Sequence, residues 1–232
     1  MITLGEWDYN SEGEVQLSAF PGSPKTLSGA LVAIDPFVPV PTVVPFQYNP
    51  HTMTRQLEAR GADGGPAATS YAGAPIETIT VEIELDATDG LEVRDEDTLA
   101  NGLHARLAAL ECLVYPASSR VLATTILAAT GSIEAIPPQG PLILFIWGPQ
   151  RVLPVSITQF SVTEEAHDPR LNPIRAKVQL GLRVLSTDDL GPLHPGHALF
   201  MAHHMAKEAL AKSASLTDMA RVLEPSAAGG AP

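Results

Sequence analysis

The stretch from Arg151 to Leu185 constrains the fold of this chain most, because it contains two strand-like runs joined by a turn. In the second run, apolar residues alternate strictly with polar ones from Ile174 to Val184. Since successive side chains of a strand point to opposite faces, this alternation predicts a strand with one buried face and one wet face. The first run changes phase between Ile157 and Phe160, which predicts a β-bulge near Gln159.

Turn-forming residues separate the two runs. Asp168-Pro169 and Asn172-Pro173 combine side chains that bond nearby backbone amides with prolines whose φ angle is fixed. We therefore expect a long β-hairpin. Its turn region offers polar and charged groups to a partner, namely Glu164, Glu165, Asp168 and Asn172.

Further strands are predicted on either side of this hairpin. Strict alternation predicts a strand over Glu77–Leu85. Short apolar runs predict strands over 29–34, 42–48 and 142–147, and Pro45 favours an edge position for the second of these. The Gly/Ala-rich stretch 57–74 is expected to be an exposed loop, either a connector or a loop ordered by a neighbour.

Helical periodicity occurs in two places. Leucines at helical spacing predict a helix over Thr98–Val114, capped by Asp95 or Asp97, that covers the sheet. A second helix is predicted over His197–Lys212, and the stretch 117–131 is compatible with either helix or loop.

These elements predict a mainly β, α+β fold, because the strands do not alternate regularly with helices. We expect a flexible N-terminal arm over 1–28 and a β domain over 29–190. A C-terminal helix over 191–215 and a disordered tail over 216–232 complete the predicted organisation.

Composition limits the classes of function. Hydrophobic residues make up 45% of the 232-residue chain and charged residues 17%, which is typical of a globular protein. The formal charge of -12 argues against nucleic-acid binding. The longest apolar run, Leu142–Trp147, is far shorter than the ~20 residues of a membrane-spanning helix, so we expect no membrane partner. The single cysteine, Cys112, and the absence of a secretory signal fit synthesis in the cytoplasm.

The candidate catalytic and metal-binding groups are weak. His194, His197, His203 and His204 crowd one region, but their spacing gives no defined ligand set, so we interpret them as solvent-facing helix residues. The acidic group around His167 lies at a hairpin turn, where nothing excludes water or perturbs a pKa. We therefore expect no enzyme activity, no metal site and no cofactor.

The polar faces of the two strictly alternating strands, Glu77–Leu85 and Ile174–Val184, are more informative about function. One carries Glu82 and Glu84, and the other carries Arg175, Lys177 and Arg183. If these strands pair, opposite charges meet across the ladder and favour one register. A wet face of this kind suits either a barrel lining or a plain solvated sheet, and the pattern alone favours the plain sheet.

Several stretches together resemble the tube and baseplate-hub proteins of contractile injection systems, which are phage-tail-like particles. The matching stretches, in order, are Phe46–Pro50, Ala74–Ile79, Leu142–Gly148, Val152–Val155, Val162–Lys177 and Leu180–Leu185. The resemblance covers about residues 29–212 and is greatest to tube-initiator or hub-adaptor subunits. Such relatives often carry a C-terminal LysM module, whereas the chain after Leu190 has neither its length nor its pattern.

The resemblance implies a tail-tube-like β-sandwich or partial barrel with one flanking helix. It also implies a hexameric ring in which hairpins join neighbouring copies at the junction of the hub and the inner tube. The expected partners are further copies of the chain, the inner-tube protein, the spike or hub protein and other baseplate subunits. The alternative function is a monomeric β-barrel module that binds a small ligand or a cell-wall fragment.

Overall fold

The computed structural model describes residues 28–35, 40–61, 72–129 and 140–223. The strands are β1 (Ala30–Ile34), β2 (Thr42–Pro45), β3 (Met53–Glu58), β4 (Ile76–Asp86), β5 (Leu142–Ile146), β6 (Val152–His167) and β7 (Pro173–Val184). The helices are α1 (Thr88–Glu92), α2 (Glu96–Asn101), α3 (His104–Glu111), α4 (Ser118–Ala129) and α5 (Pro195–Leu223).

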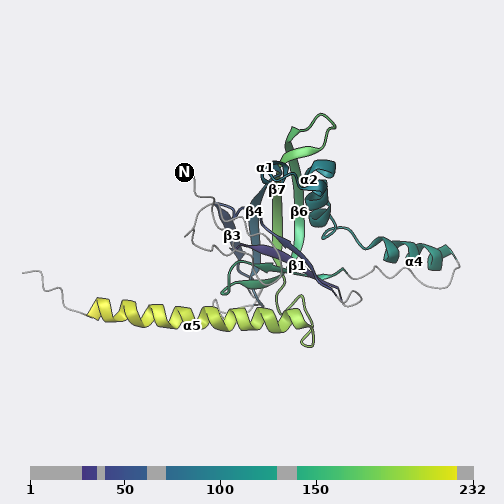
Figure 1. Ribbon diagram of the computed structural model, residues 1–232. Coiled ribbons are helices and arrows are strands. Elements are labelled where there is room, and N and C mark those ends of the chain that lie inside the picture. The colour runs from purple at the N-terminus through teal and green to yellow at the C-terminus, as the bar shows by residue number, and fades with distance from the viewer. Residues whose placement is uncertain (1–27, 36–39, 62–71, 130–139, 224–232) are drawn as a thin grey trace, which may run out of the picture.

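The described strands form one seven-stranded sheet in the order β2-β1-β5-β6-β7-β4-β3 (Figure 1). Every neighbouring pair is antiparallel. This architecture confirms the predicted α+β fold with a C-terminal helix. The sheet is not closed into a barrel, because β2 and β3 are its two ends. The predicted arm over 1–28 lies outside the described residues except for Ser28.

The predicted hairpin is β6–β7, the most extensive pairing in the sheet. Its register shifts between Ile157 and Gln159, so Thr158 is an extra residue and the predicted bulge is confirmed. At the turn, Asp168 Oδ1 accepts hydrogen bonds from the backbone amides of Arg170 (2.7 Å) and Asn172 (2.8 Å). The predicted turn chemistry therefore forms as expected.

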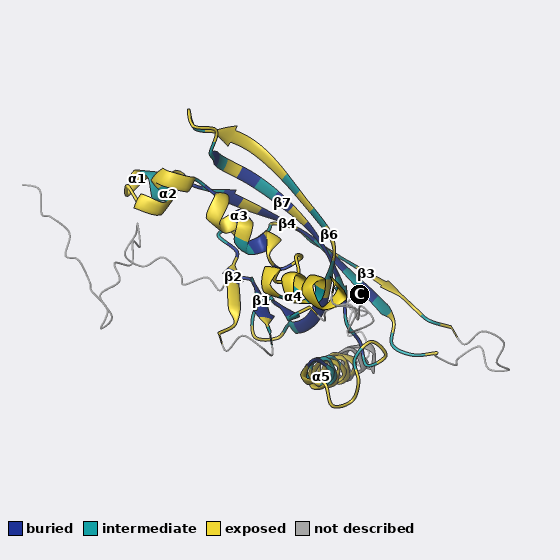
Figure 2. Ribbon diagram, turned by 90° about the vertical axis from the view of Figure 1, so that its right-hand side faces the viewer, coloured by how far each residue is buried: buried dark blue, intermediate teal, exposed yellow. Residues whose placement is uncertain are grey.

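The core lies on one side of the hairpin (Figure 2). The alternation along β7 is confirmed, because the side chains from Ala176 to Leu182 on its inner face are completely buried. These side chains form one cluster with the inner faces of β4 and of β1, β2 and β5, and with leucines from 103 to 113. Each buried aliphatic side chain contributes about 1.5–3 kcal/mol relative to leaving it in water.

The single helix predicted over Thr98–Val114 is wrong, because α2 and α3 are separate helices. Asp95 caps α2 by accepting a hydrogen bond from Thr98 N at 2.9 Å, as predicted. The break follows at Gly102, which has φ +56° and whose neighbour Leu103 donates to the carbonyl of Pro173 at 2.9 Å. A Cβ at Gly102 would lie 2.5 Å from that carbonyl oxygen. The close approach to β7 therefore ends the helix.

β3 and α5 are held to β4 through one buried carboxylate. Glu77 is 4% exposed; Arg55 Nε of β3 donates to it at 2.8 Å, and Lys207 Nζ of α5 lies 3.4 Å from its other oxygen. Burial would raise the pKa of Glu77, but the hydrogen bond from Arg55 and the charge of Lys207 outweigh burial and lower it. The helix predicted over 191–215 is thus anchored near its middle, and it extends to Leu223 rather than ending at 215.

We predict that Val178→Asp lowers the free energy of unfolding by about 3 kcal/mol or more, because it places a carboxylate with no partner at a fully buried position. Urea denaturation followed by circular dichroism measures the change. The matched variant Ser161→Asp, at an exposed position on β6, should change stability by less than about 1 kcal/mol. Equal midpoints for V178D and the unmodified protein would contradict the assigned face.

Candidate functional site

The strongest candidate is the wet face of the four strands β3, β4, β7 and β6. In Figure 2 the helices and β1 and β2 lie on the other side of these strands, so no described helix covers this face. We call it the polar face. Its residues come from register-matched positions on the four strands: Thr54, Gln56, Thr78, Thr80, Glu82, Glu84, Asp86, Gln159, Ser161, Thr163, Glu165, Arg175, Lys177, Gln179 and Arg183.

The predicted meeting of opposite charges occurs on this face. Glu84 lies opposite Lys177 in the β4–β7 register, and Glu82 lies opposite Gln179. The ion pair of Lys177 is with Glu165, at 3.0 Å. The hydrogen bond that Lys177 donates to Glu165 and the negative charge of Glu165 raise the pKa of Lys177, and the charges of Glu84 and Glu82 act in the same direction. Glu165 continues the alternation of Ser161 and Thr163 onto this face, and a second bulge of β6 lies at the same place, between Glu164 and Ala166.

Asp86 and Arg175 form the second charged contact of the polar face. Arg175 Nη2 lies 2.9 Å from Asp86 Oδ2, and the backbone amide of Thr88 donates to Asp86 Oδ1 at 2.8 Å. Burial would raise the pKa of Asp86, but the hydrogen bonds from Thr88 and Arg175 outweigh it, so this pKa lies below its ordinary value. Sequence reasoning missed Asp86, although it continues the alternation of Glu82 and Glu84.

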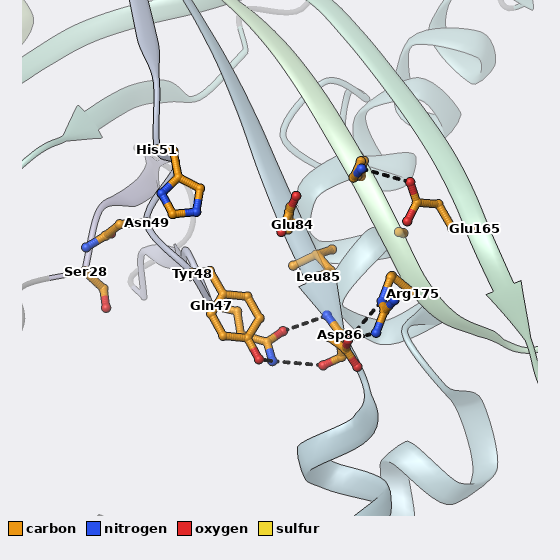
Figure 3. A pocket seen from close by; sticks show the side chains of 12 residues that line it. Ser28, Gln47, Tyr48, Asn49, His51, Glu84, Leu85, Asp86, Glu165 and Arg175 are labelled. Carbon is orange, nitrogen blue, oxygen red and sulfur yellow. Dashed lines mark hydrogen bonds and ion pairs between the residues drawn. The ribbon is translucent and has the colours of Figure 1, made fainter.

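A pocket of about 680 Å³ opens where the polar face meets residues 47–51 (Figure 3). Gln47 forms two hydrogen bonds with the backbone of Asp86, from its Nε2 to the carbonyl (2.9 Å) and from the amide to its Oε1 (3.0 Å). Tyr48 and His51 line the same pocket with Glu84, Asp86, Glu165, Arg175 and Lys177. Burial, followed by the charges of Asp89 and Asp86, raises the pKa of Tyr48. The pocket is charged, and no described group in it is placed as a nucleophile beside a base.

The hairpin turn extends beyond the polar face. Asp168 bonds the turn backbone, and its Oδ2 accepts from Asn172 Nδ2 at 3.0 Å. Asn172 also donates to the carbonyl of Ala100 at 3.2 Å, which ties the turn to α2. The exposed Glu164 is 2.9 Å from His167 Nε2. Arg183, at the opposite end of β7, forms an ion pair with Asp189.

The four strands of the polar face are bounded by two open edges. Among the described strands, β3 pairs only with β4, and β5 covers β6 only from Val152 to Val155. The rest of β6, from Ser156 to His167, therefore carries an uncovered row of backbone groups. Neither β3 nor this part of β6 contains proline, whereas the edge strand β2 contains Pro45 and follows Pro41. Proline blocks pairing at an edge, so β2 is protected by proline, whereas β3 and this part of β6 contain none.

The four C-terminal histidines differ in their surroundings. His197 Nδ1 lies 3.1 Å from the carbonyl of Leu190, and His204 is 3.3 Å from Glu208. His203 is half-buried, and burial together with the charge of Lys207 lowers its pKa. The prediction that all four face solvent is therefore wrong for His203 and His197. Within the described parts of the chain, no group of three or more His, Cys, Asp or Glu side chains is arranged to hold a metal ion.

Comparison with known proteins finds no matching family model and no matching curated protein. Among the helices that the structure describes, none is both long enough and apolar enough to cross a membrane.

We predict that Asp86→Asn destabilises the protein at neutral pH and that its effect shrinks in acid. Because the folded-state pKa of Asp86 lies below its ordinary value of 3.8, the interactions of Asp86 stabilise the fold above that pH. This stabilisation is lost as the pH falls through the lowered folded pKa. The Tm measured from neutral pH to about pH 3 should therefore converge for the two proteins.

The matched variant Arg175→Met removes one partner and leaves the Thr88 hydrogen bonds to Asp86, so its loss in Tm should be smaller. Parallel Tm curves for D86N and the unmodified protein would contradict the assigned role of Asp86.

Proposed function

We propose that this chain is a structural, non-catalytic subunit of a contractile injection system that forms a ring between the baseplate hub and the inner tube. The observation that carries the proposal is the four-stranded section β3-β4-β7-β6, with its polar face and two edges that no described strand pairs with. Such edges invite pairing with another chain.

The strand directions suit pairing around a ring. Each neighbouring pair in β6-β7-β4-β3 is antiparallel, so β6 and β3 run in opposite directions. Rotation about a ring axis preserves the direction of each strand along that axis. The open edge of β6 in one copy then meets β3 of the next copy as an antiparallel pair, and the same contact repeats until the ring closes.

A ring closed in this way encloses a water-filled channel. The inner faces of β4 and β7 are buried in the core, so the polar face is the face that lines the channel. Its mixed charges are already partly balanced within each copy by the contacts Asp86–Arg175 and Glu165–Lys177. The bulges at Thr158 and Glu165 increase the local twist of β6, and a closed sheet requires such curvature.

The resemblance in sequence supports the same proposal. The stretch Val162–Lys177 contains the hairpin turn, and Phe46–Pro50 contains Gln47, which fixes the end of β4. We accordingly propose the inner-tube protein, the spike or hub protein and other baseplate subunits as partners. The protein would be made in the cytoplasm and then assembled into a phage-tail-like particle.

The alternative of a monomeric β-barrel that binds a small ligand has less support. It requires a closed barrel, whereas the described strands form an open sheet with two free ends.

We predict that the double reversal Arg175→Glu and Lys177→Glu abolishes particle assembly and leaves the isolated subunit folded. The two side chains lie on the polar face among Glu82, Glu84 and Glu165, so the reversal concentrates negative charge there in every copy of the ring. Electron microscopy of particles measures assembly, and circular dichroism of the subunit measures folding.

The matched control reverses two exposed charges away from the polar face, Arg94→Glu and Lys212→Glu, and so causes the same change in net charge. This control should assemble normally. Particles of normal length and yield from the Arg175/Lys177 variant would contradict the proposed position of the polar face in the channel.

A further inference from the structure

Helix α4 exposes apolar side chains that a subunit on its own leaves in water. None of its residues is buried, and Val121, Leu122 and Ile126 are 47%, 62% and 55% exposed. The ion pair between Arg120 and Asp35 attaches its first turn to the end of β1. A helix with apolar residues on most of its surface is normally covered by other protein.

An apolar groove of about 680 Å³ lies at the opposite side of the subunit, between α5 and the strands β3 and β4. Leu57, Pro75, Phe200 and Met201 form its apolar walls, and polar side chains line it as well, namely Glu77, His203, His204, Lys207 and Glu208. Leu57 is 53% exposed, although it points to the same side of the sheet as the core residues Ile79 and Val81. The groove thus has the chemistry to receive the apolar face of a helix.

The positions of α4 and the groove are complementary in a head-to-tail ring. In Figure 1, α4 projects beyond the β6 side of the sheet, whereas α5 extends beyond the β3 side. In Figure 2, both helices lie on the covered side of the sheet, away from the polar face. When β6 of one copy pairs with β3 of the next, α4 of the first copy is carried over the groove of the second.

We propose that α4 docks in the α5–β3 groove of a second copy of this chain, as a contact on the outer side of the ring. This inference rests on the proposed ring, since edge pairing brings the two surfaces together. Docking removes Val121, Leu122 or Ile126 from water together with Leu57, in addition to the backbone bonds formed at the paired edges. The same two surfaces recur in every copy, so the contact is heterologous and repeats around the ring.

Cysteine crosslinking of the full-length protein tests the contact. The exposed native cysteine is first removed as Cys112→Ser. In this background, Ile126→Cys and Leu57→Cys are combined in one chain, and concentrated protein is treated with a short bismaleimide. Because each chain then carries both halves of the contact, a head-to-tail arrangement gives a ladder of dimers, trimers and larger species on a denaturing gel. Ile126→Cys with Ala202→Cys, on an exposed side of α5 outside the groove, should give no ladder.

A second crosslinking pair separates this inference from the ring itself. Gln56→Cys on β3 and Ser156→Cys on β6 report edge pairing, since both positions are exposed and the register of the sheet places them at the same level along the strands. Ladders from both pairs support the docking of α4. A ladder from Q56C/S156C without one from I126C/L57C overturns the docking and leaves the ring. The reverse result overturns edge pairing and, with it, the arrangement from which the docking was inferred. The absence of both ladders overturns the docking and the ring together.

Discussion

The uncovered backbone groups along β6 and β3 are the constraint on which the assembly of this protein depends. Backbone amides and carbonyls are obligatory hydrogen-bonding groups, and an edge strand leaves a row of them facing outward. Among the strands that the structure describes, β5 covers β6 only as far as Val155, and β3 has one partner. Water satisfies these groups in an isolated subunit. In the proposed ring, each edge satisfies the other, and the hydrogen-bond ladder becomes continuous.

The other features of the fold are consistent with this arrangement. The apolar face of the sheet is buried within each subunit by α3 and by the remaining strands, so the polar face is available for a channel. Glu77 holds β3 and α5 to β4 through Arg55 and Lys207, which fixes one of the two edges. The Asp168 turn and its contact to Ala100 fix the end of the hairpin that bears the other edge.

The sequence predicted those parts of the fold whose local structure is determined by neighbouring residues in the chain. The alternation along β7, the phase change at the bulge and the turn at Asp168 were all predictable, because period, phase and turn chemistry are encoded by adjacent residues. The break at Gly102 was not predictable. It depends on a hydrogen bond from Leu103 to Pro173, and that carbonyl belongs to a distant segment.

β3 was missed for a related reason. It places Arg55 on the inner face, so its sequence does not alternate between apolar and polar residues. A signal was nevertheless present in Glu77, which occupies the same phase as Ile79 and Val81 and therefore requires a buried partner of opposite charge. On the polar face, the sequence predicted that acidic residues of one strand would meet basic residues of the other if the two strands paired, whereas the partners Asp86 and Glu165 depended on the exact register.

Hydrogen exchange tests the central claim most directly, because it reports the backbone groups of the two edges themselves. Exchange would be measured by mass spectrometry on peptides from residues 53–58 and 156–167, in the free subunit and in assembled particles. Edge pairing predicts that both peptides become strongly protected on assembly, while a peptide from β7, already paired on both sides in the free subunit, changes little. Equal exchange of the β3 and β6 peptides in the two states would contradict the account.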